Sequence, residues 1–318
     1  MPTRAATASD GATTRGRDSS SAQRLDVRKT YKLYIGGKFP RSESGRSYEV
    51  VSAGRTPTFL ANAALGSRKD ARDAVVAARK AFGGWAGATA YNRGQVLYRV
   101  AELLEGRRAQ FVDEVSRGEG LTRPRAEKAV DAAIDRWVWY AGWTDKLAQV
   151  MGNLNPVAGP YFDISAPEPT GVVAVLAPQQ SSLLGLVSVI APVVVSGNTV
   201  VVLASERRPL PAISLSEVLA TSDVPGGVVN VLTGRTAEIA PWLASHMDVN
   251  AIDLAGTADA EGVAWGELEA AAAENVKRVL RPAGTGAEAV EPDWTATPDP
   301  GRMRAFLETK TVWHPKGT

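Results

Sequence analysis

Short apolar runs alternate with helical segments from residue 171 onward, and this alternation restricts the possible folds more than any other feature of the chain. The run VVVL at 200–203 has no polar position, which is typical of a strand buried on both faces of a sheet. Strands joined by helices form parallel sheets, so we expect an α/β fold with a doubly wound, mostly parallel, Rossmann-like sheet. The expected strands are 171–178, 198–203, 228–233, 251–254 and 276–280, and the expected helices are 182–196, 209–221, 236–245 and 262–275.

The chain before residue 152 reads as β-structure followed by helices. Residues 31–51 alternate between apolar and polar side chains, and glycines such as the Gly36-Gly37 pair divide them into a hairpin or meander. Three helices should follow, because apolar residues then recur at helical spacing. The first begins at a capping-box pattern of Ser67 and Asp70, and the other two are expected over 91–117 and 123–150.

For two of the expected helices, the sequence also predicts which side chains face the protein interior and which face solvent. In helix 123–150 an aromatic cluster is expected to pack within the protein or at a subunit interface, rather than to form a platform for a ligand. In helix 209–221 the polar residues are expected on the solvent side. The aromatic residues are Trp137, Trp139, Tyr140 and Trp143, and the polar ones are Ser214, Ser216 and Glu217.

The two ends of the chain and one internal stretch differ in composition from the rest. Residues 1–24 have no aromatic side chain, which predicts a disordered tail, with a transit peptide as the alternative. Residues 282–303 are rich in Pro, Gly, Ala and Thr, which predicts a linker. Residues 304–318 alternate like a strand, and such a strand needs a sheet to join, in this chain or in another.

Charge and residue counts exclude several classes of function. The chain has 36 Lys and Arg against 34 Asp and Glu, and this balance argues against a nucleic-acid-binding protein. It has no cysteine, which excludes a thiolate nucleophile, and only two histidines, His246 and His314. No apolar run is long enough for a membrane span. We therefore expect a cytoplasmic protein with no metal site.

Several motifs, in a constant order along the chain, carry a resemblance to a known family. From about residue 31 to residue 280 the sequence resembles the N-terminal, NAD-binding region of the aldehyde dehydrogenase superfamily. The last residues resemble the terminal oligomerisation strand of that family. The matching stretches are YIGGKFPRSESGRSY (34–48), PTGVVAVLAP (169–178), IAPVVVSGNTVVVLASE (190–206), VPGGVVNVLTG (224–234), HMDVNAIDLAGTADAEG (246–262) and FLETKTVWHP (306–315).

The resemblance also shows which catalytic groups of the family are missing. The family uses a cysteine that attacks the aldehyde, and this chain has none. The family's general-base glutamate falls on Pro282, which has no proton chemistry. The asparagine that holds the oxyanion is matched by Gln180, next to Gln179. We therefore expect no catalytic residue, and His246 is expected to lie at a helix end on the surface.

The cofactor motifs of the family are partly retained. Glu206 matches the glutamate that holds the adenosine ribose, whereas the lysine of that motif is replaced by Leu203. Gly256 and Thr257 match the turn that holds the pyrophosphate, although Asp253 beside it would repel a phosphate. The alternatives are a helix-capping role for Glu206 and a plain strand-to-helix turn at the other two. We expect that no cofactor is required and that NAD binding is possible but weakened.

The resemblance divides the chain and implies a role for its arms. The divisions are 25–152 for the hairpin and helical part, 153–170 for an arm hairpin, 171–281 for the Rossmann-like part, 282–303 for a linker in place of the catalytic domain, and 304–318 for the oligomerisation strand. Residues 155–168 and 306–314 would pair subunits. The sequence thus predicts a catalytically inactive aldehyde-dehydrogenase-like subunit that associates with itself or with a full-length aldehyde dehydrogenase. The alternatives are an NAD(P)- or nucleotide-binding module and an oxidoreductase active only in complex.

Overall fold

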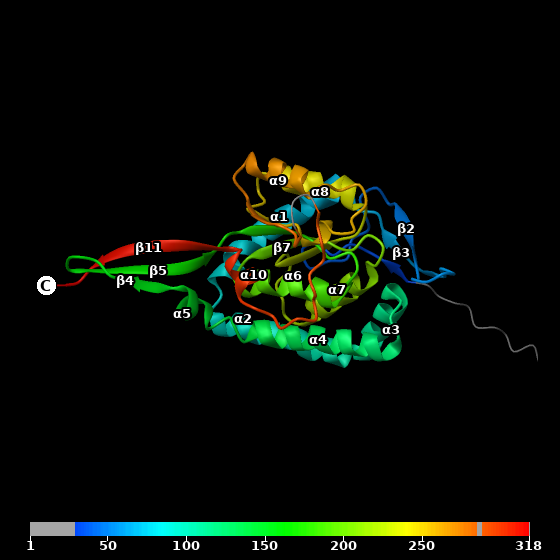
Figure 1. The fold of residues 1–318 in the computed structure, drawn as a ribbon, viewed down its shortest axis with the longest axis horizontal. Coiled ribbons are helices and arrows are strands. Elements are labelled where there is room, and N and C mark those ends of the chain that lie inside the picture. The colour runs from blue at the N-terminus through cyan, green and yellow to red at the C-terminus, as the bar shows by residue number, and fades with distance from the viewer. Residues whose placement is uncertain (1–28, 285–287, 318) are drawn as a thin grey trace, which may run out of the picture.

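A five-stranded parallel sheet forms the centre of the molecule (Figure 1). The computed structural model describes residues 29–284 and 288–317. The strand order is β10-β9-β6-β7-β8, and each neighbouring pair is parallel, which confirms the doubly wound α/β fold. The strands are β6 (Val172–Leu176), β7 (Thr199–Leu203), β8 (Val229–Leu232), β9 (Ala251–Asp253) and β10 (Arg278–Leu280), all within the expected ranges.

Helices cover both faces of this sheet, which explains why its strands are apolar throughout. In β6, Val173 and Val175 belong to one apolar cluster, whereas Val172 and Ala174 belong to the other, because successive side chains point to opposite faces. One face of the sheet carries α1 (Arg68–Gly87), α8 (Thr236–Ser245) and α9 (Trp265–Ala273) (Figure 1). The other face carries α6 (Leu184–Val195) and α7 (Leu210–Thr221). Outside these two helices lie α2 (Ala90–Gly106), α3 (Arg108–Glu119) and α4 (Arg123–Ala141). No helix in the described part of the chain is long and apolar enough to cross a membrane.

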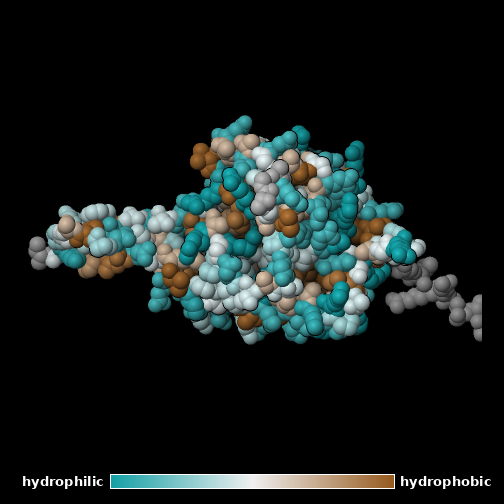
Figure 2. All heavy atoms as spheres, in the orientation of Figure 1, coloured by the Kyte–Doolittle hydropathy of each residue, from teal (hydrophilic) through white to brown (hydrophobic). Residues whose placement is uncertain are grey.

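A three-stranded antiparallel sheet projects from the body as an arm (Figure 1). It consists of β4 (Asn153–Asn155), β5 (Tyr161–Pro169) and β11 (Leu307–Pro315), in the order β11-β5-β4. The strand expected near the C-terminus therefore joins a sheet of its own chain, and it pairs with β5 along its whole length. The short helix α5 (Leu147–Met151) leads into the arm. Hydrophobic surface is visible along the arm in Figure 2.

A second small sheet near the N-terminus differs in part from the expected hairpin. It consists of β1 (Thr30–Tyr31), β2 (Ser47–Val51) and β3 (Phe59–Ala64), in the order β1-β3-β2. β1 and β2 do not pair with each other, because β3, which lies beyond residue 51, stands between them. The turn at Gly36-Gly37 is confirmed: Ile35 and Lys38 form a bridge across it, and both glycines have positive φ angles of 60° and 80°.

The capping box ahead of α1 is confirmed. The Ser67 hydroxyl accepts a hydrogen bond from the Asp70 backbone N–H at 3.4 Å. The Asp70 carboxylate in turn accepts from the Ser67 backbone N–H at 2.8 Å. The Asp70 carboxylate also accepts from the Ser42 hydroxyl at 2.8 Å, so the cap ties the loop before β2 to the start of α1.

Each of the two long helices expected before residue 152 is divided, so that prediction was wrong in detail. Residues 91–117 form α2 and α3, separated at Arg107, whose φ of −111° and ψ of 13° are not helical. The Arg107 side chain donates to Glu217 of α7 at 2.6 Å, which fixes the break against a neighbouring helix. Residues 123–150 form α4 and α5, with turns over residues 142–146.

The aromatic cluster of α4 packs inside the protein, as expected. Trp137 and Tyr140 are almost completely buried. Trp139 contacts the rings of Tyr140 and Trp143, at centroid distances of 4.8 and 5.5 Å. The apolar cluster on this side of the sheet includes all four residues, so α4 is held against α6 by aromatic packing.

The segment expected to be a linker is packed against the body where it is described. It contains the short helix α10 (Gly301–Arg304), which contacts α6. Trp294, Met303 and Phe306 from this region are buried in the same core as α6. The segment therefore adds to the core in addition to connecting β10 to β11.

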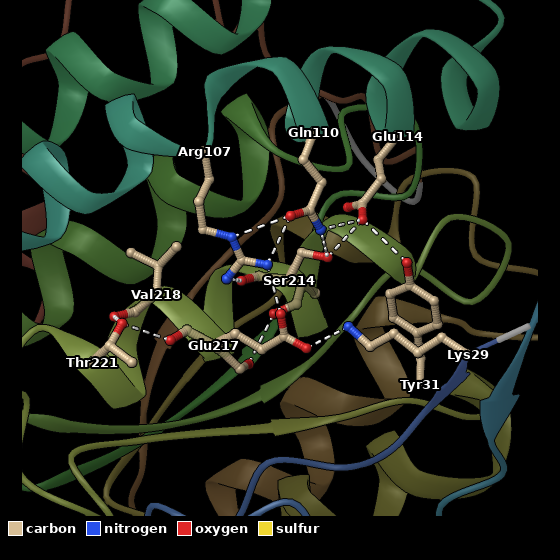
Figure 3. Close-up of polar contacts among 11 residues, drawn as sticks. Lys29, Tyr31, Arg107, Gln110, Glu114, Ser214, Glu217, Val218 and Thr221 are labelled. Atoms are coloured by element: carbon tan, nitrogen blue, oxygen red, sulfur yellow. Dashed lines mark hydrogen bonds and ion pairs between the residues drawn. The ribbon is translucent and has the colours of Figure 1, made fainter. Parts of the chain in front are cut away.

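The expected solvent side of α7 was wrong for its serines. Ser214 and Ser216 are fully buried, and only Glu217 is partly exposed. Ser214 faces α3, where its hydroxyl donates to the Glu114 carboxylate at 2.7 Å. Figure 3 shows the network around this contact, in which Tyr31 and Gln110 donate to the same Glu114 oxygen. These polar groups join β1, α3 and α7 beneath the surface.

Glu114 makes the stability of the fold depend on pH. Burial raises the pKa of its carboxyl, against the effect of its hydrogen-bond donors, so the folded state keeps a proton that the unfolded chain releases near pH 4.5. Stability contributed by this group is therefore lost as pH rises through the raised pKa. We expect Glu114→Gln to remove that loss, as measured by urea unfolding between pH 4 and 7.

The control for this prediction is Glu217→Gln in the same network. Burial raises the pKa of Glu217, but hydrogen bonds from Lys29 and Arg107 outweigh burial and lower it. Its stabilisation is present above the unfolded pKa and is lost on acidification, so the pH dependence of the two variants should differ from the parent in opposite directions. Parallel pH profiles for Glu114→Gln and the parent chain would contradict the prediction.

Candidate functional site

The strand order of the parallel sheet reverses between β6 and β9. β6 comes first in the sequence, β7 and β8 follow on one side of it, and β9 and β10 lie on the other side. Ligands of open α/β sheets bind where the strand order reverses in this way. Glu206 follows β7, and Gly256 and Thr257 follow β9, so the fold brings the candidate residues to this edge of the sheet.

Glu206 is held by the start of α8. Its Oε2 accepts from the Thr236 backbone N–H at 3.0 Å, and its Oε1 pairs with the Arg235 guanidinium at 2.5 Å. The Glu206 backbone N–H donates to the Gln179 side chain at 3.0 Å. Both carboxylate oxygens are therefore used within the chain. Glu206 therefore caps a helix, which was the alternative to a ribose-binding role. The capped helix is α8, whereas the helix that follows Glu206 in the sequence is α7.

Gly256 and Thr257 lie in a single turn of 3-10 helix, η1 (Ala255–Thr257). A Cβ added at Gly256 would lie 2.1 Å from the Ala177 carbonyl oxygen and 2.4 Å from that of Leu176, so the glycine lets two backbone segments approach closely. The Thr257 hydroxyl is buried and donates to the Leu254 carbonyl at 2.8 Å. Both residues serve contacts inside the protein.

The charge of Asp253 is balanced by a residue that sequence reasoning missed. Asp253 is fully buried; one carboxylate oxygen accepts from the Ala255 backbone N–H at 3.0 Å, and the other pairs with Arg302. Arg302 comes from α10, in the segment expected to be a linker. The repulsion expected at this turn is therefore countered by a cation. No local pattern links the two positions, which are 49 residues apart.

The loop after β6 is occupied by protein contacts as well. The buried Gln179 side chain donates to the Ala177 carbonyl at 3.0 Å, and the Gln180 backbone N–H donates to Glu291 at 2.7 Å. Glu119 accepts from both the hydroxyl and the backbone N–H of Ser182 at 2.6 Å. Burial raises the pKa of the Glu119 carboxyl. Glu119 and Glu291 were not singled out from the sequence, because each acts on a loop distant along the chain.

These contacts do not fit a dinucleotide at the three candidate residues as they are placed. The ribose ligand of the family motif, Glu206, has both oxygens engaged by α8. The space opposite Gly256 is filled by backbone carbonyls, and the Thr257 hydroxyl is committed to Leu254. A bound NAD would have to share the Glu206 carboxylate with Arg235 and Thr236, and would find no space opposite Gly256.

His246 lies at the end of α8, as expected. It is the C-cap residue of that helix, and its Nδ1 accepts from the Asp248 backbone N–H at 3.1 Å. Its ring packs on Trp242 at a centroid distance of 4.4 Å. Burial lowers the pKa of the imidazole.

Comparison with known proteins decides the family. The model of the aldehyde dehydrogenase family matches residues 39–290. The chain belongs to the aldehyde dehydrogenase family. The match extends from the loop before β2 to the segment after β10, and so it includes the whole parallel sheet. The resemblance based on the sequence motifs is thereby confirmed.

The curated relatives are longer than this chain. Aldehyde dehydrogenase, cytosolic 1, from Elephantulus edwardii is 31% identical over 252 residues, which are 78% of this chain and 49% of the relative. Retinal dehydrogenase 2 from Gallus gallus is 33% identical over 261 residues, 80% of this chain and 48% of the relative. The chain thus spans about half the length of the curated relatives that it matches.

Solved structures of the family share the fold. The NAD+ complex of an aldehyde dehydrogenase from Bacillus cereus has a TM-score of 0.72 and 26% identity, and the match covers 79% of this chain and 50% of that one. PnpE from Pseudomonas sp. WBC-3 has the same TM-score of 0.72 at 27% identity. The Rossmann-like α/β fold is therefore that of the aldehyde dehydrogenases.

Proposed function

We propose that this chain is a catalytically inactive aldehyde-dehydrogenase-like subunit, which associates with itself or with a full-length aldehyde dehydrogenase in a structural or regulatory role. The proposal of inactivity is supported by the absence of any cysteine and by Pro282 at the place of the family's glutamate. It is also supported by the internal contacts of Glu206, Gly256 and Thr257. A cytoplasmic location is part of the proposal, by analogy with the relative named cytosolic 1.

The observation that carries the proposal is an exposed apolar row across the arm. Leu154 of β4 is opposite Ile164 of β5, which is opposite Val312 of β11, so the three side chains share one face. They are 67%, 47% and 47% exposed. Phe162, two residues along β5, extends the same face and is also exposed. Figure 2 shows this hydrophobic character on the arm.

The opposite face of the arm carries paired polar groups together with the exposed rings of Tyr161 and Trp313, whose centroids are 5.7 Å apart. Asn155 donates to Ser165 at 2.8 Å, and Ser165 and Thr311 share a hydrogen bond of the same length. The arm therefore has an aliphatic row on one face, and paired polar groups with one aromatic pair on the other. β4 and β11 are also edge strands, whose unpaired backbone groups can pair with another chain. A second subunit that covers 155–168 and 306–314 would bury the apolar row and stabilise the complex.

The association can be tested by light scattering. We expect the purified chain, alone or mixed with a full-length aldehyde dehydrogenase, to have a molar mass above that of the 33.6 kDa monomer. Val312→Asp should shift the mass toward the monomer, because it places a charge in the apolar row. Thr309→Asp is the matched control: it lies on the same strand but on the other face, and should leave the mass unchanged.

The outcome also separates the alternatives that remain. A monomeric mass for the parent chain in both samples would overturn the proposed association. Calorimetry with millimolar NAD and NADP would then test the nucleotide-binding module, which is supported by the relatives that bind NAD. Under the favoured proposal neither nucleotide gives heat. An aldehyde oxidation rate that rises on mixing would instead support an oxidoreductase active only in complex.

A further inference from the structure

A small cavity lies where the segment after β10 crosses α4 and α6. Its volume is about 250 Å³. Arg136 and Tyr140 reach it from α4, Ser188 from α6, and Arg302 from α10. The remaining wall is formed by residues 292–299, including the buried Trp294. None of the family motifs in the sequence falls on this wall segment, and the candidate cofactor residues do not line the cavity.

Arg136 brings an unbalanced charge to this cavity. The residue is 8% exposed, and it donates to the Ser188 hydroxyl at 2.7 Å and to the carbonyls of Trp294 and Ala296 at 2.9 Å. All three acceptors are neutral, and no acidic residue in the described part of the chain pairs with it. Burial lowers the pKa of the guanidinium. A buried cation without a counterion is costly, which favours a bound anion.

Two more donors line the cavity. Tyr140 is 1% exposed, and it reaches the cavity from α4. Burial raises the pKa of Tyr140 to about 12, so the phenol keeps its proton at neutral pH and can donate. The second donor is the Nε of Arg302, which is buried and has no hydrogen-bond partner in the described part of the chain. Buried donors are nearly always satisfied, so a missing acceptor is informative.

The charges around the cavity define the kind of anion. Among the buried charged groups, Arg302 is already balanced by Asp253, which leaves the Arg136 guanidinium as the unpaired cation. Asp293 and Asp299 also line the cavity, but both are exposed and accept from backbone N–H groups of their own loop, at 2.9 and 2.6 Å. A second negative charge on the ligand would meet these carboxylates. A monoanion is therefore favoured over a phosphate dianion.

Shape and chemistry then point to one ligand class. A carboxylate is planar and matches the donor geometry of a guanidinium. Pro292, Trp294 and Pro298 supply apolar wall for a short hydrocarbon body. We propose that the cavity formed by Arg136, Tyr140 and Arg302 binds a small monocarboxylate. The proposal does not depend on association through the arm.

The test is calorimetric titration of the full chain with sodium acetate, propionate and benzoate, at constant ionic strength set by chloride. We expect saturable binding of at least one of these carboxylates. Tyr140→Phe removes only the phenolic hydroxyl and keeps the buried ring, so it should leave the unfolding temperature unchanged. It should weaken carboxylate binding about tenfold, the usual effect of losing a hydrogen bond to a charged group.

Matched variants make the result specific. Tyr98→Phe on α2 lies outside the cavity and is 48% exposed, so it should not change carboxylate affinity. Arg136→Gln should abolish binding, and unfolding temperature will report whether the loop that Arg136 holds stays in place. Equal affinity in the parent chain and in Tyr140→Phe would overturn the proposal. So would a parent chain that gives no saturable heat with any of the three carboxylates.

Discussion

Replacing Phe306 by alanine is expected to lower the free energy of unfolding by about 3–5 kcal/mol, the range for deleting a fully buried aromatic side chain. Phe306 is 0% exposed and belongs to the core that contains α6. Phe306 comes immediately before β11, at the point where the chain enters the arm. Its backbone carbonyl accepts a hydrogen bond from the Asn198 side chain at 2.8 Å, which fixes this point against the body. Urea unfolding at neutral pH would measure the loss.

The control is the same substitution on an exposed face. Phe162 lies on the arm and is 42% exposed, so Phe162→Ala, measured at a protein concentration where the chain is monomeric, should cost about 1 kcal/mol or less. If Phe306→Ala were as mild as Phe162→Ala, the residues just after the expected linker 282–303 would not be packed in the core that contains α6. The comparison therefore tests the packing of this segment directly.

Replacing Gly256 by alanine is expected to destabilise the protein by about 3 kcal/mol or more, at the upper end for overpacking. The new Cβ would lie 2.1 Å from the Ala177 carbonyl oxygen, a distance that Cβ atoms do not adopt without backbone movement. β6 and η1 would have to separate, which disturbs the carboxyl edge of the sheet. Thermal and urea unfolding of the purified variant would measure the effect.

A second glycine gives a control of opposite sign. Gly266 is in α9, and a Cβ there meets nothing within 4 Å, so Gly266→Ala should stabilise the protein by about 0.5–1 kcal/mol through helix propensity. If Gly256→Ala left stability unchanged and altered only NAD binding, Gly256 would serve a ligand and not the close approach of two backbone segments. The pair of variants therefore separates these two roles.

Local patterns were sufficient for most elements of the parallel sheet. The expected helix 236–245 has the bounds of α8, and each expected strand from 171 to 280 contains an observed one. The reason is that hydrophobic periodicity and turn residues act over a few neighbouring positions. The division of 91–117 at Arg107 was not predicted, because it is fixed by Glu217 on a different helix.

At the candidate site, too, contacts between segments far apart in the chain were not predicted. The motifs placed Glu206, Gly256 and Thr257 near one edge of the sheet, and the strand order agrees. The sequence did not indicate that Thr236 and Arg235 would take both oxygens of Glu206, or that Arg302 would pair with Asp253. These partners depend on which loops meet at the carboxyl ends of the strands. A single sequence carries no signal for such pairs.

The sequence by itself therefore determined the family, the α/β class, and the order of the strands and helices along the chain. Tertiary structure decided what these elements face. It placed β11 on β5 of the same chain, buried Ser214 against Glu114, and brought Tyr140 and Arg136 to one cavity with Arg302. The physical reason is that periodicity fixes which side of an element is apolar, whereas the partner of a polar side chain is chosen by packing between segments far apart in the chain.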